Sequence, residues 1–153
     1  MSLFLVQHGE SVGKEIDPAR PLSDGGMSSV TRMAAVARDY HIRVSEIVHS
    51  GKTRAQQTAE VLASFLHPPE GVKALRGLDP RDDVTAFAET VRAEDDRMIV
   101  GHLPFLERLL SFLTTKTPGN RIMRFQNGCI VCLDKDPEDS SWHIKWVLMP
   151  DIG

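Results

Sequence analysis

Three residues that suit phosphate chemistry stand just past short apolar runs of this sequence. His8 follows the run that ends at Gln7, and His102 follows the run that ends at Gly101. Arg54 comes shortly after a third run. A neutral imidazole is a nucleophile, and a guanidinium binds phosphoryl oxygens through several N–H groups. Each residue alone has a structural explanation, as a packing or loop histidine or a paired surface arginine, but together the three suit one phosphate.

Arg54 occupies an unfavourable position for its charge. A helix is expected over residues 52–66, and this places the cation in its first turn. A positive charge there opposes the helix dipole and costs about a few tenths of a kcal/mol. An anion bound between the helix amino terminus and the guanidinium would offset that cost. Arg54 is therefore a candidate anion ligand.

Apolar runs and helical periodicity alternate along the chain. Strands are expected over the first apolar run and over residues 44–49, 72–75, 97–101, 128–133 and 142–148. Besides residues 52–66, helices are expected up to about residue 40, from Asp79 onward and from Pro104 onward. Asp79 is expected to cap the third of these helices. Trp142 and Trp146 are expected to pack on one face of the last strand.

The alternation predicts an α/β fold: a three-layer αβα sandwich with a mostly parallel central sheet, which allows an antiparallel edge. In such open sheets, ligands bind where the carboxyl ends of the strands meet the amino termini of helices. His8, Arg54 and His102 are all expected at that edge.

Length and composition fit one soluble domain over residues 1–153. Apolar residues make up 41% of the chain and charged residues 25%, with a formal net charge of −3. That charge favours neither nucleic acid nor an anionic membrane as a partner, and the start of the sequence does not resemble a signal peptide. Cys129 and Cys132 are spaced to face opposite sides of one strand, so neither a mutual disulfide nor a shared metal is expected. A reduced, cytoplasmic protein is the simplest expectation.

Four segments, in order, match the pattern of a known family. They are Gln7-His8-Gly9, Arg20-Pro21-Leu22-Ser23-Asp24-Gly25-Gly26, Ser50-Gly51-Lys52-Thr53-Arg54-Ala55-Gln56-Gln57-Thr58 and Val100-Gly101-His102-Leu103-Pro104. Together they resemble the histidine phosphatase superfamily, which is phosphoglycerate mutase-like, and within it the short SixA-like phosphohistidine phosphatases. The resemblance covers nearly the whole chain and implies the phosphoglycerate mutase-like fold.

The resemblance also implies a function for each matching residue. His8 would be the nucleophile that becomes phosphohistidine, and the Gly9 region would fix its tautomer. Arg54 and His102 would hold oxygens of the transferring group, with Arg20 as a further anion contact. Because protein cations would supply the charge, neither a metal nor another cofactor is expected.

One position departs from the family pattern. Gln7 stands where the family has arginine, so a neutral amide replaces a bidentate guanidinium among the phosphate-binding residues. Loss of such a contact can cost ~3 kcal/mol, or about 100-fold in rate. Lys14, six residues after His8, is the candidate replacement charge, and a solvated loop lysine is its alternative.

The mutases and acid phosphatases of the superfamily use a carboxylic acid, usually a glutamate, as proton donor, and no glutamate stands in the corresponding segment here, residues 75–83. A phosphohistidine releases imidazole, whose conjugate acid has a pKa of about 6.5, so it needs less protonation than an alkoxide does. We therefore expect a phosphatase acting on phosphohistidine in a signalling or phosphotransfer protein, such as a histidine phosphotransfer domain. Two alternatives stay open: a general small-molecule phosphomonoesterase, and a catalytically weak phosphate- or phosphoprotein-binding module, which Gln7 favours.

Overall fold

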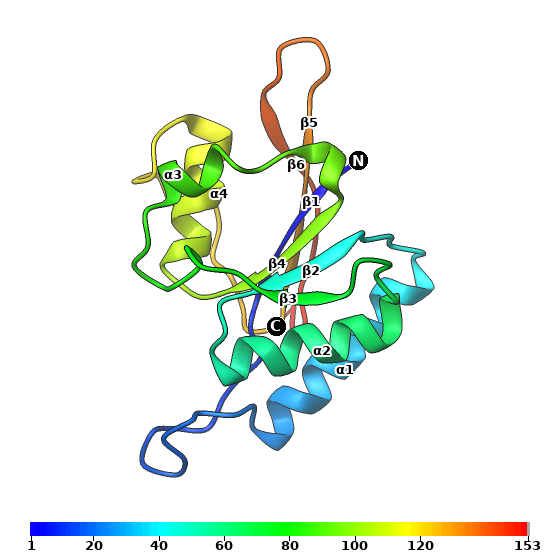
Figure 1. Ribbon diagram of the computed structural model, residues 1–153, viewed down its shortest axis with the longest axis vertical. Helices are drawn as coiled ribbons and strands as arrows, with labels where there is room; N and C mark the ends of the chain where they lie inside the picture. The colour runs from blue at the N-terminus through cyan, green and yellow to red at the C-terminus, as the bar shows by residue number, and fades with distance from the viewer. Residues whose placement is uncertain (153) are drawn as a thin grey trace.

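The computed structural model describes residues 1–152, which form a six-stranded sheet with helices on both faces (Figure 1). The strands are β1 (Leu3–Gln7), β2 (Glu46–His49), β3 (Val72–Ala74), β4 (Arg97–Gly101), β5 (Ile130–Lys135) and β6 (Trp142–Leu148). The helices are α1 (Asp24–Asp39), α2 (Thr53–Leu66), α3 (Val84–Ala88) and α4 (Phe105–Thr115), with a short 3-10 helix at Ala93–Asp95. No helix of the described residues is long and apolar enough to cross a membrane.

The sheet is parallel over most of its width. Its strand order is β3-β2-β4-β1-β5-β6. The first four strands in that order pair in parallel, whereas β5 runs antiparallel to β1 and β6 antiparallel to β5. The mixed α/β fold expected from the sequence is therefore confirmed. The carboxyl ends of β1, β2 and β4 meet at one edge, where the candidate residues follow them.

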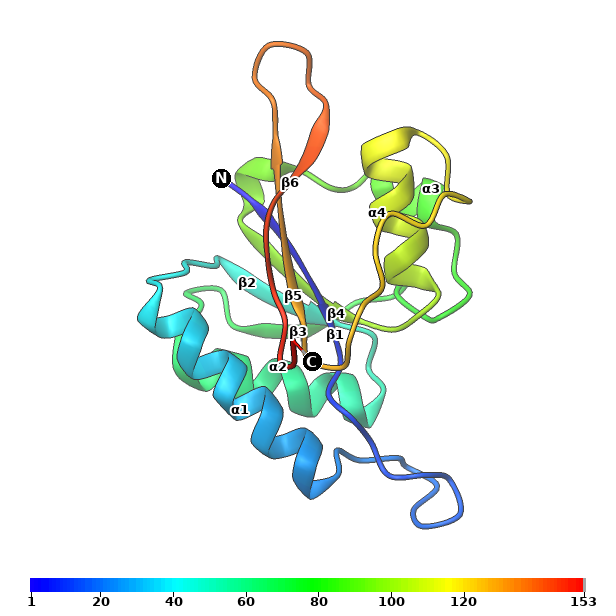
Figure 2. The same ribbon diagram turned by 180° about the vertical axis from the view of Figure 1, so that it is seen from behind.

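Two apolar cores lie on opposite faces of this sheet. Alternate residues of β1 divide between them, with Leu3 and Leu5 packed under α3 and α4, and Phe4 and Val6 packed under α1 and α2. Figure 2 shows the two helical layers from behind, separated by the strands. This alternation explains why β1 is a continuous apolar run, since a central strand is buried on both faces.

The third helix begins later than the sequence predicts. The N-cap of α3 is Asp83, whose carboxylate accepts a hydrogen bond from the backbone N–H of Thr85 at 2.9 Å. Asp82 instead accepts from the backbone N–H of Asp79 at 2.8 Å and closes a turn before the helix. The expectation that Asp79 caps a helix is therefore wrong, because two later carboxylates form competing bonds to the backbone.

A β-bulge separates the two tryptophans of β6. Cys132 pairs with Trp146, but the next residue, Leu133, pairs with Ile144, so the register shifts between them. Trp142 consequently packs in the core under α3 and α4, while Trp146 contacts Phe4 on the other face, with ring centroids 6.0 Å apart. The expectation of a single face is wrong, since a bulge adds one residue and breaks the alternation.

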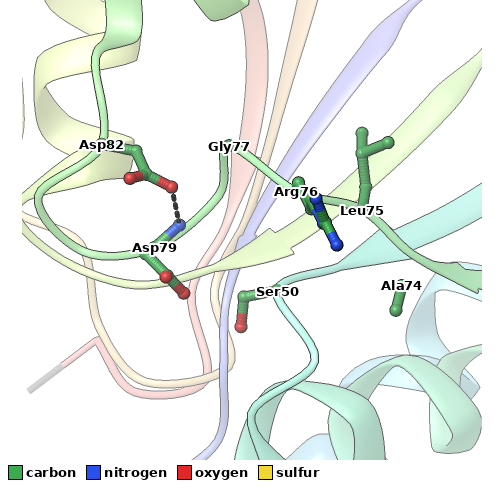
Figure 3. A pocket seen from close by; sticks show the side chains of 7 residues that line it. All are labelled: Ser50, Ala74, Leu75, Arg76, Gly77, Asp79 and Asp82. Atoms are coloured by element: carbon green, nitrogen blue, oxygen red, sulfur yellow. Dashed lines mark hydrogen bonds between the residues drawn. The ribbon is translucent and has the colours of Figure 1, made fainter.

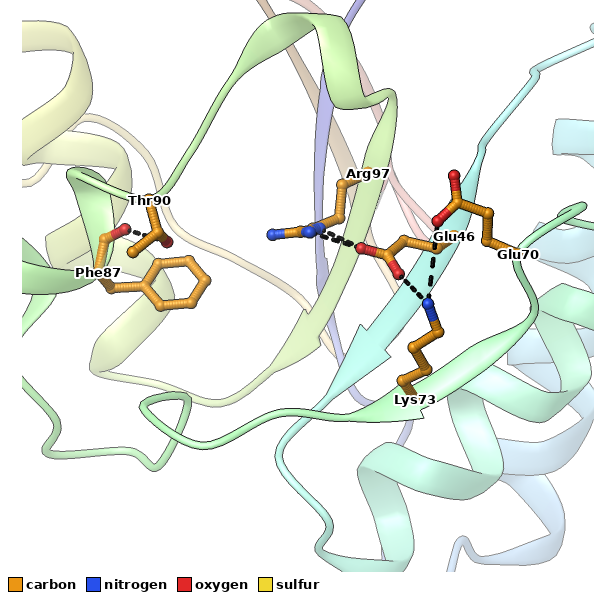
Figure 4. Close-up of polar contacts among 6 residues, drawn as sticks. All are labelled: Glu46, Glu70, Lys73, Phe87, Thr90 and Arg97. Carbon is orange, nitrogen blue, oxygen red and sulfur yellow. Dashed lines mark hydrogen bonds and ion pairs between the residues drawn. The ribbon is translucent and has the colours of Figure 1, made fainter.

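A buried glutamate ties three strands at the edge opposite the candidate site. Glu46 of β2 accepts a hydrogen bond from Arg97 of β4 at 2.6 Å and another from Lys73 of β3 at 3.0 Å (Figure 4). Burial acts to raise the pKa of Glu46, but the bonds from Lys73 and Arg97 outweigh it and hold the pKa below its usual value. This cluster fixes the β3-β2-β4 register that brings the strand ends together. Figure 4 also shows the Thr90 hydroxyl donating to the Phe87 carbonyl at 2.7 Å, where α3 ends.

Candidate active site

His8 is the first residue past β1 and is fixed in one tautomer. Its backbone N–H donates to the carbonyl of Gly101 in β4 at 3.1 Å, which holds the residue at the sheet edge. Its ring Nδ1 lies 2.6 Å from the Gly9 carbonyl oxygen. Because a carbonyl oxygen only accepts, Nδ1 carries the proton, and Nε2 presents a lone pair away from the backbone.

A buried threonine couples His8 to the helix that carries Arg54. The Thr58 hydroxyl of α2 accepts a hydrogen bond from the Gly9 N–H at 3.0 Å and donates to the Arg54 carbonyl at 2.8 Å. Gly9 must be glycine for this approach, since a Cβ there would lie 2.6 Å from a methyl group of Val30 in α1. In Figure 1 the blue segment after β1 passes the first turn of α2 before it enters α1.

Arg54 and His102 lie beside His8. The Arg54 Nε is 3.4 Å from His8 Nε2, the atom with the free lone pair. The His8 and His102 ring centroids are 5.0 Å apart. The three residues chosen from the sequence are therefore brought together, although they are separated by up to 94 positions in the chain, the difference between 8 and 102.

His102 is held by a serine at the start of α2. The Ser50 hydroxyl lies 2.6 Å from His102 Nε2 and accepts a hydrogen bond from the Lys52 backbone N–H at 3.3 Å. Where the serine donates its own proton to Nε2, the proton of the neutral His102 ring is on Nδ1. That Nδ1 is buried and has no hydrogen-bond partner.

Burial keeps both imidazoles neutral. Desolvation lowers the pKa of His8; the Gly9 carbonyl opposes that shift, and the charges of Arg54 and Arg20 add to it. Neutral His8 is the form with a nucleophilic lone pair.

The pKa of His102 falls further, to about 3. Desolvation is the main cause, followed by the charges of His8, Arg54, Lys52 and Arg20. Burial and Arg20 also lower the pKa of Arg54. Several cations thus surround one small volume, which is the electrostatic environment of an anion site.

The unpaired buried atoms point to the same ligand. Among residues 1–152, three buried side-chain polar atoms lack a hydrogen-bond partner: Gln7 Oε1, Arg20 Nε and His102 Nδ1. Each such atom costs about 1–3 kcal/mol when left unpaired. An oxyanion would accept hydrogen bonds from the Arg20 and His102 nitrogens, and rotating the Gln7 amide by half a turn would replace its unpaired oxygen with an NH₂ donor.

Arg20 shows a second sign of a functional position. Its φ is +49°, in the left-handed region that a residue with a side chain enters at a cost of about 1–3 kcal/mol. The loop around it is closed by the Val12 N–H, which donates to the Pro21 carbonyl at 2.9 Å. Strain that the surrounding bonds impose at a residue with an unpaired guanidinium nitrogen is typical of a preorganised ligand site.

Arg20 lies near enough to His8 and His102 for its charge to lower the pKa of both, whereas Gln7 is placed only as the buried residue before His8. Lys14 is exposed on the loop between Ser11 and Leu22, whereas the lysine whose charge acts on His102 is Lys52. Reasoning from the sequence missed Lys52 as a cation and Ser50 and Thr58 as positioning residues. All three belong to residues 50–58, and the match of this segment to the family pattern could have identified them as functional residues. No group of three or more His, Cys, Asp or Glu side chains suited to a metal occurs among the described residues.

The sequence and the fold both have relatives among known proteins, although no family model matches the sequence. The phosphohistidine phosphatase SixA of Escherichia coli strain K12 is 24% identical over 156 residues, which cover 98% of this chain and 94% of that protein.

Solved structures show the same fold. A structure of the protein histidine phosphatase SixA complexed with tungstate has a TM-score of 0.81 at 24% identity and covers 98% of this chain and 97% of its own. The alpha-ribazole phosphatase of Shigella flexneri has a TM-score of 0.73 at 18% identity, covering 100% of this chain and 98% of its own. By sequence and by structure, this chain is a homologue of the phosphohistidine phosphatase SixA, and it has the phosphoglycerate mutase-like fold.

Proposed function

We propose that this protein is a phosphatase that hydrolyses phosphohistidine through a covalent phosphohistidine intermediate on His8. The observation that carries the proposal is the convergence of Arg54, His102 and Arg20 on a histidine with an unprotonated Nε2, together with buried unpaired atoms on Arg20 and His102. A phosphoryl group is the ligand whose charge and oxygens suit them. The similarity to SixA supplies the substrate class.

In the first step, His8 Nε2 attacks phosphorus while the bond from phosphorus to the substrate nitrogen breaks. The electron pair of the broken bond stays on the departing imidazole, and His8 keeps its Nδ1 proton on the Gly9 carbonyl. Arg54, Arg20 and His102 hold the equatorial oxygens, over which charge is spread in the transition state. In the second step, water attacks the phosphorus of phosphorylated His8, which releases inorganic phosphate and restores the free enzyme.

Arg54 serves the first step because it lies beside His8, where it can contact both the nucleophile and the phosphoryl oxygens. Its Nε lies 3.4 Å from His8 Nε2, which presents the lone pair. A bound phosphoryl group would take over that N–H, which frees the lone pair for attack. The substrate would then help to activate its own nucleophile.

We further propose that the phosphohistidine belongs to a partner protein, such as a histidine phosphotransfer domain, and that the reaction is cytoplasmic. Both cysteines are free and buried, which suits a reducing compartment. The general phosphomonoesterase and the weak binding module remain the alternatives that an assay must separate.

The test compares wild type with His8→Ala on a phosphohistidine protein and on p-nitrophenyl phosphate. Wild type should hydrolyse phosphohistidine and carry acid-labile, base-stable phosphate during turnover, whereas His8→Ala should do neither. His143→Ala, at an exposed position on β6, is the matched control and should behave as wild type. Equal rates for His8→Ala and wild type would refute the nucleophile. Faster turnover of p-nitrophenyl phosphate would favour the general esterase, and binding of phosphohistidine without turnover would favour the binding module.

A further inference from the structure

A cavity of about 590 Å³ opens next to the phosphate-binding residues. Its lining residues are Ser50, Ala74, Leu75, Arg76, Gly77, Asp79 and Asp82. The cavity adjoins the site through Ser50, whose hydroxyl contacts His102, and the His102 ring in turn lies 5.0 Å from the His8 ring. Going outward from the nucleophile, the order is therefore His8, His102, Ser50 and then the cavity.

A leaving group that extends from a phosphoryl group at His102 can reach the cavity past Ser50. In phosphoryl transfer the attacking and leaving atoms lie roughly in line on opposite sides of phosphorus. A phosphoryl group held against Arg54 and His102 has His8 on one side, so the rest of the substrate extends away from His8. The cavity volume far exceeds that of a phosphoryl group and leaves room for a ring.

Asp79 presents a free carboxylate to this cavity. Its backbone N–H donates to the Asp82 carboxylate at 2.8 Å, and its carbonyl accepts from the Asp82 N–H at 3.0 Å. These two bonds hold the turn, and Figure 3 shows the Asp79 side chain directed towards Ser50. Within residues 1–152 no hydrogen bond or ion pair engages the Asp79 carboxylate. It does not cap α3, so its position in the cavity has no structural explanation in the helix.

The charge of Asp79 suits one class of leaving group. An N-phosphorylated imidazole departs as neutral imidazole only if its other ring nitrogen carries a proton, and that N–H is most acidic while the ring is still bound to phosphorus. A carboxylate that accepts this N–H stabilises the cationic ring, as carboxylates do for histidines in many enzymes. A phosphate ester instead develops negative charge on its leaving oxygen, which an ionised carboxylate does not stabilise.

We propose that the cavity between Ser50 and Asp79 binds the leaving imidazole of phosphohistidine, and that the Asp79 carboxylate accepts the hydrogen bond of its distal N–H and so selects phosphohistidine over phosphate esters. The phosphorus–nitrogen bond breaks as the bond to His8 Nε2 forms, the electron pair stays on the leaving ring, and the distal proton remains on that ring. This inference rests on the proposed phosphohistidine phosphatase function and names a residue that sets its specificity.

The test is the ratio of kcat/KM for free phosphohistidine to that for p-nitrophenyl phosphate in Asp79→Asn. We expect about a tenfold fall with phosphohistidine, the scale of a lost charge-assisted hydrogen bond, and no fall with the ester. Asp79→Glu should recover part of the ratio. Asp39→Asn is the control, since this exposed residue ends α1 and is absent from the cavity lining.

Two outcomes would overturn the inference while leaving the proposed function intact. One is an unchanged ratio in Asp79→Asn, and the other is an equal loss for both substrates, which would mean that Asp79 only shapes the loop. Failure of the wild-type protein to hydrolyse phosphohistidine would instead refute the proposed function itself.

Discussion

His102 should make the stability of the protein depend on pH, and replacing it should remove its share of that dependence. The pKa of His102 is lowered from 6.5 to about 3, chiefly by burial. A histidine whose pKa is depressed on folding binds fewer protons in the native than in the unfolded state. The contribution of His102 to the free energy of unfolding is therefore fully present above pH 6.5, and it is lost as the pH falls from there towards the pKa of the folded state.

The expected magnitude follows from those two pKa values. Between pH 7 and pH 5 the unfolded histidine takes up its proton and the native one does not, which lowers the free energy of unfolding by about 2 kcal/mol. This figure changes little so long as the native pKa stays well below 5. The lowered pKa values of His8 and His49 add losses of the same sign, so the difference between variants, not the total, isolates His102.

Urea unfolding at several values between pH 7 and pH 5 provides the assay, with wild type, His102→Gln and His143→Gln side by side. A glutamine can still accept the Ser50 hydrogen bond but does not titrate. His102→Gln should lose about 2 kcal/mol less than wild type over this interval, and His143→Gln, at an exposed position, should follow wild type. Parallel curves for all three proteins would mean that native His102 titrates like an exposed histidine, and the electrostatic description of the site would be refuted.

Three further predictions concern the residues around His8. Gln7→Arg should raise kcat/KM for a phosphate ester by about tenfold to 100-fold, the scale of one added oxyanion contact, and should raise kcat/KM for phosphohistidine by less; unchanged values for both substrates would remove position 7 from the phosphate ligands. Lys52→Ala should lower kcat/KM by about tenfold and more than Lys14→Ala does, because the Lys52 charge acts on His102; a larger loss from Lys14→Ala would reverse the assignment. Thr58→Val should lower kcat and cost about 1–3 kcal/mol in unfolding free energy, because the Gly9 N–H loses its acceptor. Thr31→Val, on the exposed face of α1, is the control for Thr58→Val and should leave both measurements unchanged.

The sequence predicted the elements whose signals are local. The strand at residues 97–101 and the helix ending near Leu66 were placed correctly, because glycine, proline and apolar periodicity mark their ends within a few residues. The start of α3 was misplaced because three aspartates near it can all bind backbone N–H groups, and tertiary packing decides which one caps. The opposite faces of Trp142 and Trp146 depend on a one-residue bulge, which leaves no mark in the alternation of β6.

The convergence of the candidate site was predictable for a similar reason. His8 and His102 each follow a parallel strand, and parallel strands present their carboxyl ends at one edge. The hydrogen bonds that position these residues join Ser50 to His102 and Thr58 to Gly9, across 52 and 49 positions. Such partners are set by how α2 packs beside β1 and β4, and a single sequence carries no periodic signal for them.

The neutral side chain of Gln7 suits a leaving group that departs without negative charge. The charge of Arg20 lowers the pKa of Arg54, and the charges of Arg20, Arg54 and Lys52 lower the pKa of His102. A guanidinium at position 7, where the side chain is only 9% exposed, would add to this repulsion and to the cost of burying charge. An alkoxide leaving group needs that extra charge, whereas a departing imidazole is neutral once its distal nitrogen is protonated. With a neutral amide at position 7 and a carboxylate at Asp79, the site has less positive charge of its own. This suits a phosphohistidine substrate, whose protonated ring brings a positive charge with it.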